Sequence, residues 1–370
     1  MESYLTSVEG LKMVKIGFVG CGSMSRAHVI RLSHLEEGEA EIRGLCDVNP
    51  ENAKKLIKTI NKFRNISPEP LTERNIYSDY SKMLGELDLE ALIVCTPHVF
   101  HYEHVMAGLK RGLHVLVEKP MAISISQAEE MRDTAEERGL ILAVGYQRHF
   151  QPEYFYAREV IMSGRLGEPH FVLAWLTQDL RRAVGRRGWY LQPSLSGGGQ
   201  VICSGTHLND IVLWVTGTEP RRVKAIMDLE GAEVEMYASL SVELSNGAIA
   251  SISLLGDSPE IALREEMRVW CSKGAVLVKD GNIYIQEKGG DLVMMPHENL
   301  PRPPSPSPDV NFVRAILGKE ECLVPAQCGV NATKLERMAY RDAEPIPNNL
   351  KPYILGSRSR ENLQIQKAST

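Results

Sequence analysis

Short apolar runs and segments with helical periodicity alternate along the first 145 residues. Between two runs the apolar positions recur at the spacing of one helix face, as in Ala27, Ile30 and Leu35. Strands that alternate with helices predict a parallel, doubly wound α/β sheet, and we assign residues 13–145 to this domain. The apolar runs expected to form its strands lie at 14–19, 42–46, 89–94, 114–117 and 140–144.

A second pattern begins near residue 222, where short strand-like segments follow one another without helices between them. Asn246-Gly247 and Asp280-Gly281 are typical of two-residue hairpin turns. We therefore predict a C-terminal α/β domain over residues 146–345 with a large, mostly antiparallel, open sheet, flanked by tails at 1–12 and 346–370. Its strands are expected at 223–229, 233–244, 248–255, 265–271, 275–279 and 283–286, and its helices at 153–162, 200–215, 309–317 and 328–341.

Composition excludes several classes of protein. The 370 residues carry a formal net charge of −5, which offers no basic footprint for nucleic acid or an anionic membrane. The apolar runs are far shorter than the ~20 residues needed to cross a bilayer. Seven cysteines without a CxxC pair argue against a disulfide framework or a structural metal site. We expect a cytoplasmic protein with no metal and no nucleic-acid or membrane partner.

A glycine turn follows the first apolar run. Gly20, Gly22, Ser23 and Met24 lead into the first helical segment, and the next apolar run ends in Asp47, about 25 residues after the glycines. Glycines there let the backbone approach a pyrophosphate at a helix N-terminus, and a carboxylate ~20 residues further on binds a ribose hydroxyl. This arrangement predicts a dinucleotide site; the alternative is an ordinary turn in which Asp47 caps a helix.

Two further strand ends carry polar side chains, Thr96-Pro97-His98 and Glu118-Lys119-Pro120. The carboxyl ends of parallel strands meet at one crevice, so we expect these residues beside the glycine turn. A lysine there can bind a substrate hydroxyl and assist removal of its proton. The alternative for Lys119 is an exposed residue in a turn.

The helix expected at 200–215 follows Gly197-Gly198-Gly199. Cys203, His207 and Asp210 are spaced i, i+4 and i+7 along it, and would share one face of a continuous helix. His207 could then stand beside Lys119 and relay a proton. Alternatively, it is a histidine of the core, which is the commoner role on an apolar helix.

Taken together, these segments resemble the glucose–fructose oxidoreductase / inositol dehydrogenase (Gfo/Idh/MocA) family. The resemblance extends from about residue 14 to residue 343. The matching motifs are Gly20-Cys21-Gly22-Ser23-Met24, Cys46-Asp47, Thr96-Pro97-His98 with His101, Glu118-Lys119-Pro120, Gly145-Tyr146-Gln147-Arg148, Trp189, and Gly197-Gly198-Gly199 with His207.

The resemblance implies an N-terminal Rossmann domain and NAD(P)-dependent oxidation or reduction of a sugar, cyclitol or related polyol. Asp47 favours NAD over NADP, because a carboxylate repels a 2′-phosphate. Dimers or tetramers formed through the C-terminal sheet are also implied. The implied catalytic residues are Lys119 and His207. The implied cofactor-binding residues are Gly20, Gly22, Ser23, Met24, Asp47, Thr96, Pro97, His98, His101, Glu118, Lys119, Gln147 and Trp189; the implied substrate-binding residues are Lys119, Arg148, Tyr190, Cys203 and His207.

Two positions depart from the family pattern. Cys203 stands where family dehydrogenases commonly carry aspartate, and Tyr190 replaces an arginine. A thiol is a weak hydrogen-bonding group and cannot supply a carboxylate's charge. Two alternatives to a dehydrogenase therefore stay open: a related NAD-using glycosidase and a non-catalytic regulator that binds nucleotide and sugar.

Four arginines precede the triple glycine within an irregular segment. They form either a solvated basic loop or a grip for an acidic or phosphorylated substrate, because guanidinium groups suit such anions. They are Arg181, Arg182, Arg186 and Arg187.

Overall fold

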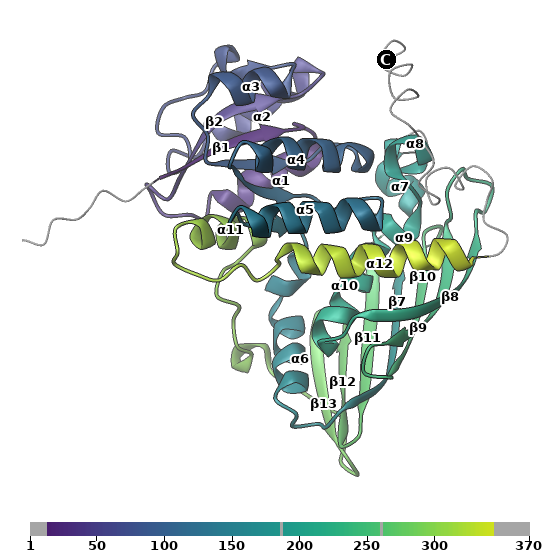
Figure 1. The fold of residues 1–370 in the computed structure, drawn as a ribbon. Helices are drawn as coiled ribbons and strands as arrows, with labels where there is room; N and C mark the ends of the chain where they lie inside the picture. Colours follow the sequence, from purple (N-terminus) through teal and green to yellow (C-terminus); the bar gives the residue numbers. More distant parts are fainter. Residues whose placement is uncertain (1–12, 186–187, 260–261, 344–370) are drawn as a thin grey trace, which may run out of the picture.

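The structure of the chain, a computed structural model, describes residues 13–185, 188–259 and 262–343. The predicted tails lie outside these residues. Figure 1 shows two α/β parts stacked on each other, with the long helix α12 (Ala326–Asp342) lying across the junction.

The first sheet is wholly parallel and has the strand order β3-β2-β1-β4-β5-β6. This is the order of a dinucleotide-binding doubly wound sheet, and the predicted N-terminal fold is confirmed. The order reverses between β1 and β4, which opens a crevice at the carboxyl ends of these strands. The strands are β1 (Val14–Val19), β2 (Ala40–Cys46), β3 (Ile76–Tyr77), β4 (Ala91–Val94), β5 (His114–Val117) and β6 (Leu142–Val144).

Helices cover both faces of this sheet, which explains why its strands are apolar runs rather than alternating ones. On β4, Leu92 and Val94 pack with α3, α4 and α5, whereas Ala91 and Ile93 pack with α1 and α2 on the opposite face. The helices are α1 (Ser23–Leu32), α2 (Pro50–Ile60), α3 (Tyr80–Glu86), α4 (His101–Lys110) and α5 (Ile125–Glu137).

The second sheet has eight strands in the order β14-β13-β12-β11-β7-β10-β9-β8. Only the pair β7 and β10 is parallel, so the predicted large, mostly antiparallel sheet is confirmed. Both hairpin predictions hold, at Asn246-Gly247 and Asp280-Gly281. The strands are β7 (Pro169–Thr177), β8 (Pro220–Asp228), β9 (Tyr237–Leu244), β10 (Ile249–Leu255), β11 (Arg264–Cys271), β12 (Gly274–Lys279), β13 (Asn282–Glu287) and β14 (Val293–Met294).

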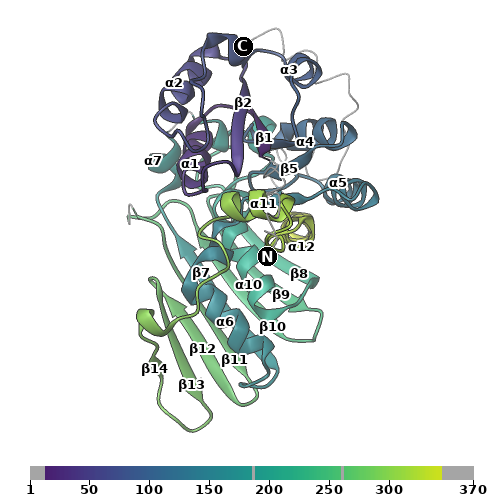
Figure 2. The same ribbon diagram turned by 90° about the vertical axis from the view of Figure 1, so that its left-hand side faces the viewer.

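One face of the second sheet is covered by helices α6 (Pro152–Met162), α10 (Gly205–Thr216) and α12, as Figures 1 and 2 show together. All twelve residues of α10 are buried, including the polar residues His207, Asn209 and Asp210 of its first half. Helix α12 contributes to both cores: Val330 and Ala332 pack with the first sheet, and Leu335 and Ala339 with the second.

The single helix expected at 200–215 is instead two helices, α9 (Gln200–Cys203) and α10, separated at Ser204. Gly205 makes the break tight, because a Cβ there would lie 2.7 Å from the Gln200 carbonyl oxygen. A one-residue break leaves the hydrophobic spacing unchanged, so periodicity did not reveal it. The shortest elements were also missed, among them β3, β14, α7 (Leu180–Val184) and α8 (Pro193–Ser196).

Among the described residues, the helices are too short or too polar to cross a membrane.

Helix α11 (Pro308–Ile316) returns the chain to the first sheet after the second sheet is complete. Its residues Val310, Phe312 and Val313 are fully buried in the same core cluster as β1 and β2. The two parts are therefore tied together by a segment distant in sequence.

We predict that Phe312→Ala lowers the free energy of unfolding by about 3–5 kcal/mol, because it leaves a cavity in the core of the first domain. Urea denaturation followed by fluorescence measures the change. The control is Val48→Ala, whose side chain is 91% exposed and whose effect should stay within about 0.5 kcal/mol. Equal midpoints for the two variants would contradict the role of α11.

Candidate functional site

A small cavity of about 70 Å³ lies at the carboxyl ends of β1, β4 and β5. It brings together ten of the residues predicted to form the site. Its lining consists of Gly22, Ser23, Met24, Cys95, Thr96, His98, His101, Glu118, Lys119, Trp189 and Tyr190.

The glycine turn forms one wall, and its two glycines serve different needs. Gly20 has φ +85°, and a Cβ there would lie 2.6 Å from the carbonyl oxygen of Cys95. A Cβ at Gly22 would meet nothing within 4 Å and would project into open space beside the cavity. Ser25, at the position of a third glycine, is buried, and its hydroxyl donates to the Gly20 carbonyl at 2.5 Å. Gly22 thus leaves room at the N-terminus of α1 for a phosphate group.

Asp47 follows β2 and reaches back to the same turn. Its Oδ2 accepts the backbone N–H of Cys21 at 2.7 Å, and its Oδ1 accepts that of Asn49 at 2.8 Å. Arg43 is paired with Glu41 on the same strand and does not neutralise Asp47. A carboxylate without a cationic partner at this place suits a ribose diol rather than a 2′-phosphate.

Lys119 reaches across the junction of the two parts. Its Nζ donates to the backbone carbonyl of Cys203, at the end of α9, at 2.9 Å. The side chain is half-buried and lines the cavity, so the exposed-turn alternative does not hold. The peptide bond from Lys119 to Pro120 is cis.

Two buried histidines brace the strand ends. The His101 ring nitrogens lie 2.8 Å from the carbonyl oxygens of Pro120 and of Thr96, which connects the ends of β5 and β4. His98 Nδ1 donates to the Ser196 carbonyl at 2.9 Å. Burial, reinforced by the charge of the neighbouring Lys119, holds the pKa of His98 well below its usual value, so this ring is neutral at pH 7.

An aromatic pair closes the cavity from the second part of the chain. Trp189 and Tyr190 stack with ring centroids 3.8 Å apart, and both rings meet His98 edge-on. Flat apolar rings at a pocket mouth can cover a sugar or nicotinamide ring.

His207 lies one helical turn beyond the Lys119 contact. Its backbone N–H donates to Ser204, and its ring packs edge-on against Tyr146 with centroids 6.0 Å apart. Its buried Nδ1 has no hydrogen-bond partner among the described residues. His207 is not part of the cavity lining. The helical turn that carries it begins next to Cys203, whose backbone carbonyl accepts the hydrogen bond from Lys119.

Cys203 and Asp210 do not act as the helix spacing suggested. The Cys203 side chain is buried with Leu180 and Met236, and burial raises the pKa of its thiol. Asp210 is buried and accepts from His149 Nε2 at 2.7 Å, so it cannot replace the missing family carboxylate. Cys203 lies in α9, before the break, whereas His207 and Asp210 both lie in α10 and contact the segment that contains Tyr146 and His149.

Sequence reasoning missed the residues that hold the glycine loop at 197–199. The buried Glu235 carboxylate accepts the backbone N–H groups of Gly199 and Val201 at 2.8 and 2.9 Å, and caps the N-terminus of α9. The Tyr340 hydroxyl donates to the same carboxylate at 2.6 Å. A Cβ at Gly198 or Gly199 would collide with these two residues. Glu235 falls on the polar side of the alternating pattern at 233–244, so nothing in the sequence signalled its burial.

The remaining predicted residues lie elsewhere. Arg148 is buried in a bidentate ion pair with Glu265 of β11, and its substrate role stays a prediction. Gln147 is the first residue of the short 3₁₀ helix Gln147–Phe150, which also contains Arg148. Of the arginine cluster, Arg181 pairs with Asp257 and Arg182 is exposed, while residues 186–187 lie outside the described part. The structure therefore gives no support to a site in which these arginines bind an acidic or phosphorylated substrate.

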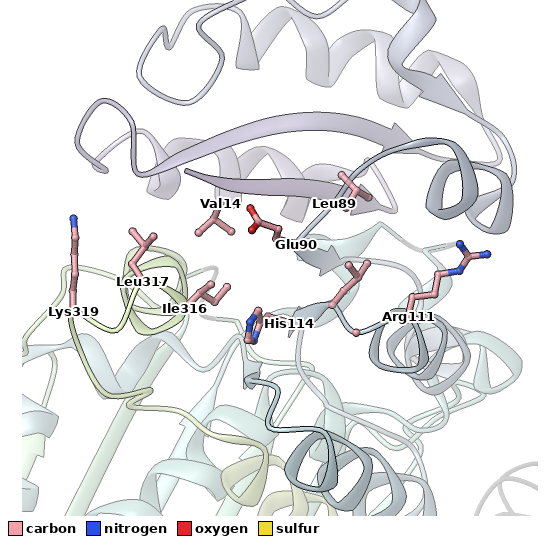
Figure 3. A pocket seen from close by; sticks show the side chains of 10 residues that line it. Val14, Leu89, Glu90, Arg111, His114, Ile316, Leu317 and Lys319 are labelled. Carbon is pink, nitrogen blue, oxygen red and sulfur yellow. The ribbon is translucent and has the colours of Figure 1, made fainter. Parts of the chain in front are cut away.

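A larger cavity, of about 390 Å³, lies at the opposite edge of the first sheet, where β1, β4 and β5 begin. Figure 3 shows Glu90 and His114 near its centre, with Lys319 and Arg111 at its two ends. Lys319 is paired with Glu39, and Arg111 donates to the Leu84 carbonyl. Since ligands of doubly wound sheets bind at the carboxyl ends of the strands, we assign the functional site to the smaller cavity.

Comparisons with known proteins identify the family of the chain. Residues 14–146 match the oxidoreductase family with an NAD-binding Rossmann fold, and residues 154–277 match the GFO/IDH/MocA C-terminal domain. The chain is 31% identical over 370 aligned residues to the D-glucoside 3-dehydrogenase of Escherichia coli, covering 93% of this chain and 98% of that enzyme. It is 29% identical over 255 residues to the glucose-6-phosphate 3-dehydrogenase of Bacillus subtilis, covering 65% and 67%.

Solved structures share the fold. An inositol dehydrogenase homolog from Azotobacter vinelandii, complexed with NAD⁺, matches with a TM-score of 0.77 at 17% identity, covering 91% of this chain and 96% of that one. The WlbA dehydrogenase from Bordetella pertussis, in complex with NADH and UDP-GlcNAcA, matches with a TM-score of 0.74 at 22% identity, covering 90% and 96%. The chain therefore belongs to the Gfo/Idh/MocA family of oxidoreductases, and its first domain is an NAD-binding Rossmann domain.

Proposed function

We propose that the protein is an NAD-dependent dehydrogenase that oxidises a secondary hydroxyl group of a glucoside-like sugar. The observation that carries this proposal is the position of Lys119, whose ammonium group lies in the cavity formed by the glycine turn. Support for a sugar substrate comes from the two relatives described above, whose names place oxidation at carbon 3 of a glucoside and of glucose 6-phosphate.

The cofactor would be held by three groups of the first domain. The open side of Gly22 and the N-terminus of α1 accommodate the pyrophosphate, Asp47 binds the adenosine ribose, and Thr96 with Glu118 borders the nicotinamide. NAD, when bound, supplies the acceptor for the hydride that leaves the sugar carbon.

Lys119 and His207 act on the substrate hydroxyl. The Lys119 ammonium donates a hydrogen bond to the hydroxyl oxygen and stabilises the negative charge that develops there as the proton leaves. The proton from this oxygen is accepted by His207, whose Nδ1 has no hydrogen-bond partner among the described residues; because this ring lies outside the cavity lining, the transfer is indirect. Trp189 and Tyr190 supply an apolar surface for the sugar ring.

The substitution at position 203 does not detach Lys119. The lysine is held by the backbone carbonyl of Cys203, which every residue type provides. The missing carboxylate changes the charge beside Lys119, but it does not remove the contact that holds the ammonium group of this lysine. The contact answers the question of position and not that of charge, so the turnover assay described below decides between a dehydrogenase and a non-catalytic regulator.

An exposed apolar surface supports assembly with a second copy of the chain. The outer face of the second sheet carries Phe171 and Leu173 on β7, Ile249 and Leu255 on β10, and Ile226 on β8, with side chains 38–75% exposed. Phe171 lies beside Ile249 in the register of the sheet. Apolar patches of this kind on a sheet favour burial against another protein surface. The proposal includes a homodimer or homotetramer formed through this face.

The two glycines of the turn predict opposite phenotypes. Gly22→Ala should fold like the wild type but bind NAD at least about tenfold more weakly, a loss of about 1.4 kcal/mol, because its methyl group enters the phosphate space. Gly20→Ala should unfold at a lower temperature, because its methyl group strikes the Cys95 carbonyl. Calorimetric titration with NAD and thermal melting measure both effects. Wild-type NAD affinity in Gly22→Ala would contradict this placement of the cofactor.

Lys119→Met should lower kcat/KM for sugar oxidation by about 10²- to 10⁴-fold, the usual contribution of a group that assists proton transfer. NADH formation from a panel of glucosides and cyclitols provides the assay, with Lys110→Met on the outside of α4 as the matched control. Undiminished turnover by Lys119→Met overturns the catalytic role. Sugar release without net NADH would indicate the glycosidase instead.

The double variant Leu173→Lys/Ile249→Lys should be monomeric in light scattering coupled to gel filtration, whereas the wild type should be a dimer or tetramer. Two lysines on the apolar face would have to be buried without partners in the assembly. The control is Ile30→Lys on α1, which is 45% exposed and far from this sheet. Equal masses for the wild type and the double variant would rule out this interface.

A further inference from the structure

A buried histidine links the cavity to the C-terminal part of the chain. His28 lies on α1, and its ring is fully buried between two carboxylates. Its Nε2 is 2.9 Å from Oε1 of Glu118, and its Nδ1 is 2.5 Å from Oδ1 of Asp309, on α11. No motif in the sequence pointed to this contact, because its three members lie 90 and 281 residues apart.

The two carboxylates define the charge of the ring. An ionised carboxylate only accepts hydrogen bonds, so both nitrogens of His28 must donate, and only an imidazolium carries two N–H groups. Burial opposes that charge, but Asp309, together with Cys95, more than offsets it, so the pKa of His28 is raised well above its usual value. The other groups that face the ring are Cys95 after β4 and Glu118 after β5, while Arg31 on α1 pairs with Asp309 at 3.0 Å.

Glu118 is the member of this cluster that meets the site. It lines the cavity, and its second oxygen, Oε2, accepts the backbone N–H of Lys119 at 3.1 Å. Burial would favour the neutral acid, but the hydrogen bond and charge of His28, with Lys119 and Arg31, lower the pKa of Glu118 to about 2. Glu118 therefore stays ionised beside the catalytic lysine.

The cluster contains two cations, His28 and Arg31, and two anions, Glu118 and Asp309, so that its net charge is zero. Without His28, the charge of Glu118 would be left buried with Lys119 and Arg31 as the remaining cations that act on it. An ammonium that is drawn to an uncompensated buried carboxylate is less available to donate a hydrogen bond to a substrate hydroxyl. The Arg31–Asp309 pair alone already connects α1 to α11, so joining the two helices does not require His28.

We propose that His28, with Asp309 behind it, is a positioning residue of the active site that neutralises Glu118 and so reserves the Lys119 ammonium for the substrate hydroxyl. The inference rests on the proposed role of Lys119. It concerns a residue that touches neither the sugar nor the reacting carbon.

The first test measures the charge of His28 without any turnover. In ¹⁵N-histidine-labelled protein, the His28 ring, assigned by its loss in His28→Gln, should show two protonated nitrogens at pH 7. A neutral ring at pH 7 would overturn the proposal. This measurement does not require turnover. If the ring is charged but no sugar is oxidised, only the proposed function fails.

The second test is the pH profile of kcat/KM. In His28→Gln the acid limb of the profile should move to higher pH by about one unit, so that activity on that limb falls about tenfold and recovers at alkaline pH, because the uncompensated Glu118 carboxylate favours the protonated form of the group that accepts the substrate proton. Lys110→Met, an exposed lysine on the outside of α4 that has no part in this cluster, should keep the wild-type profile. A role in stability alone would lower the rate equally at every pH, and that result would refute the proposal.

Asp309→Asn provides a variant that retains the imidazole. Its amide no longer supports the charge of the ring, so the profile should move in the same direction as in His28→Gln, by a smaller amount. This variant decides the question if His28→Gln does not fold. An unchanged profile in Asp309→Asn, with a native melting temperature, would count against the proposal.

Discussion

The hydrogen bond from Lys119 to the Cys203 carbonyl connects the two halves of the molecule at the point where the chemistry is proposed to occur. The lysine comes from the end of a strand in the first sheet, and the carbonyl from a short helix of the second part. A change in the position of either part would therefore displace the ammonium group. Positioning within a fraction of an ångström is what catalysis of this kind requires.

Several buried polar groups keep that geometry in place. Glu235 and Tyr340 fix the start of α9 from one side, and His28 with Glu118 fixes the lysine loop from the other. Helices α11 and α12, the last elements of the chain, supply Asp309 and Tyr340 to these networks. Buried polar groups are costly unless they are paired, so each network specifies one arrangement of its loop. The C-terminal helices thus contribute to the site without lining it.

The fold could be predicted because its determinants are local in sequence. Apolar runs such as 14–19 and 114–117 indicate buried parallel strands, and the turn at Asp280-Gly281 indicates a hairpin. The glycine turn and Lys119 could be placed in one crevice because parallel strands end at the same edge. The helix break at Ser204 could not be predicted, because one residue leaves the hydrophobic spacing unchanged. The contacts of His28 could not be predicted either, because its partners are far away in sequence. For the same reason, the backbone contact of Cys203 was not foreseen.

The central claim is that hydride leaves a sugar carbon in the cavity beside Lys119. The most direct measurement uses an alkyl glucoside with deuterium on carbon 3 and follows the isotope by mass spectrometry of the reduced cofactor. The account predicts that the NADH carries the deuterium and that the sugar product is a ketone. NADH free of deuterium, formed together with an oxidised sugar, would show that another carbon is oxidised, and unaltered sugar with no NADH across the whole polyol panel would contradict the account itself.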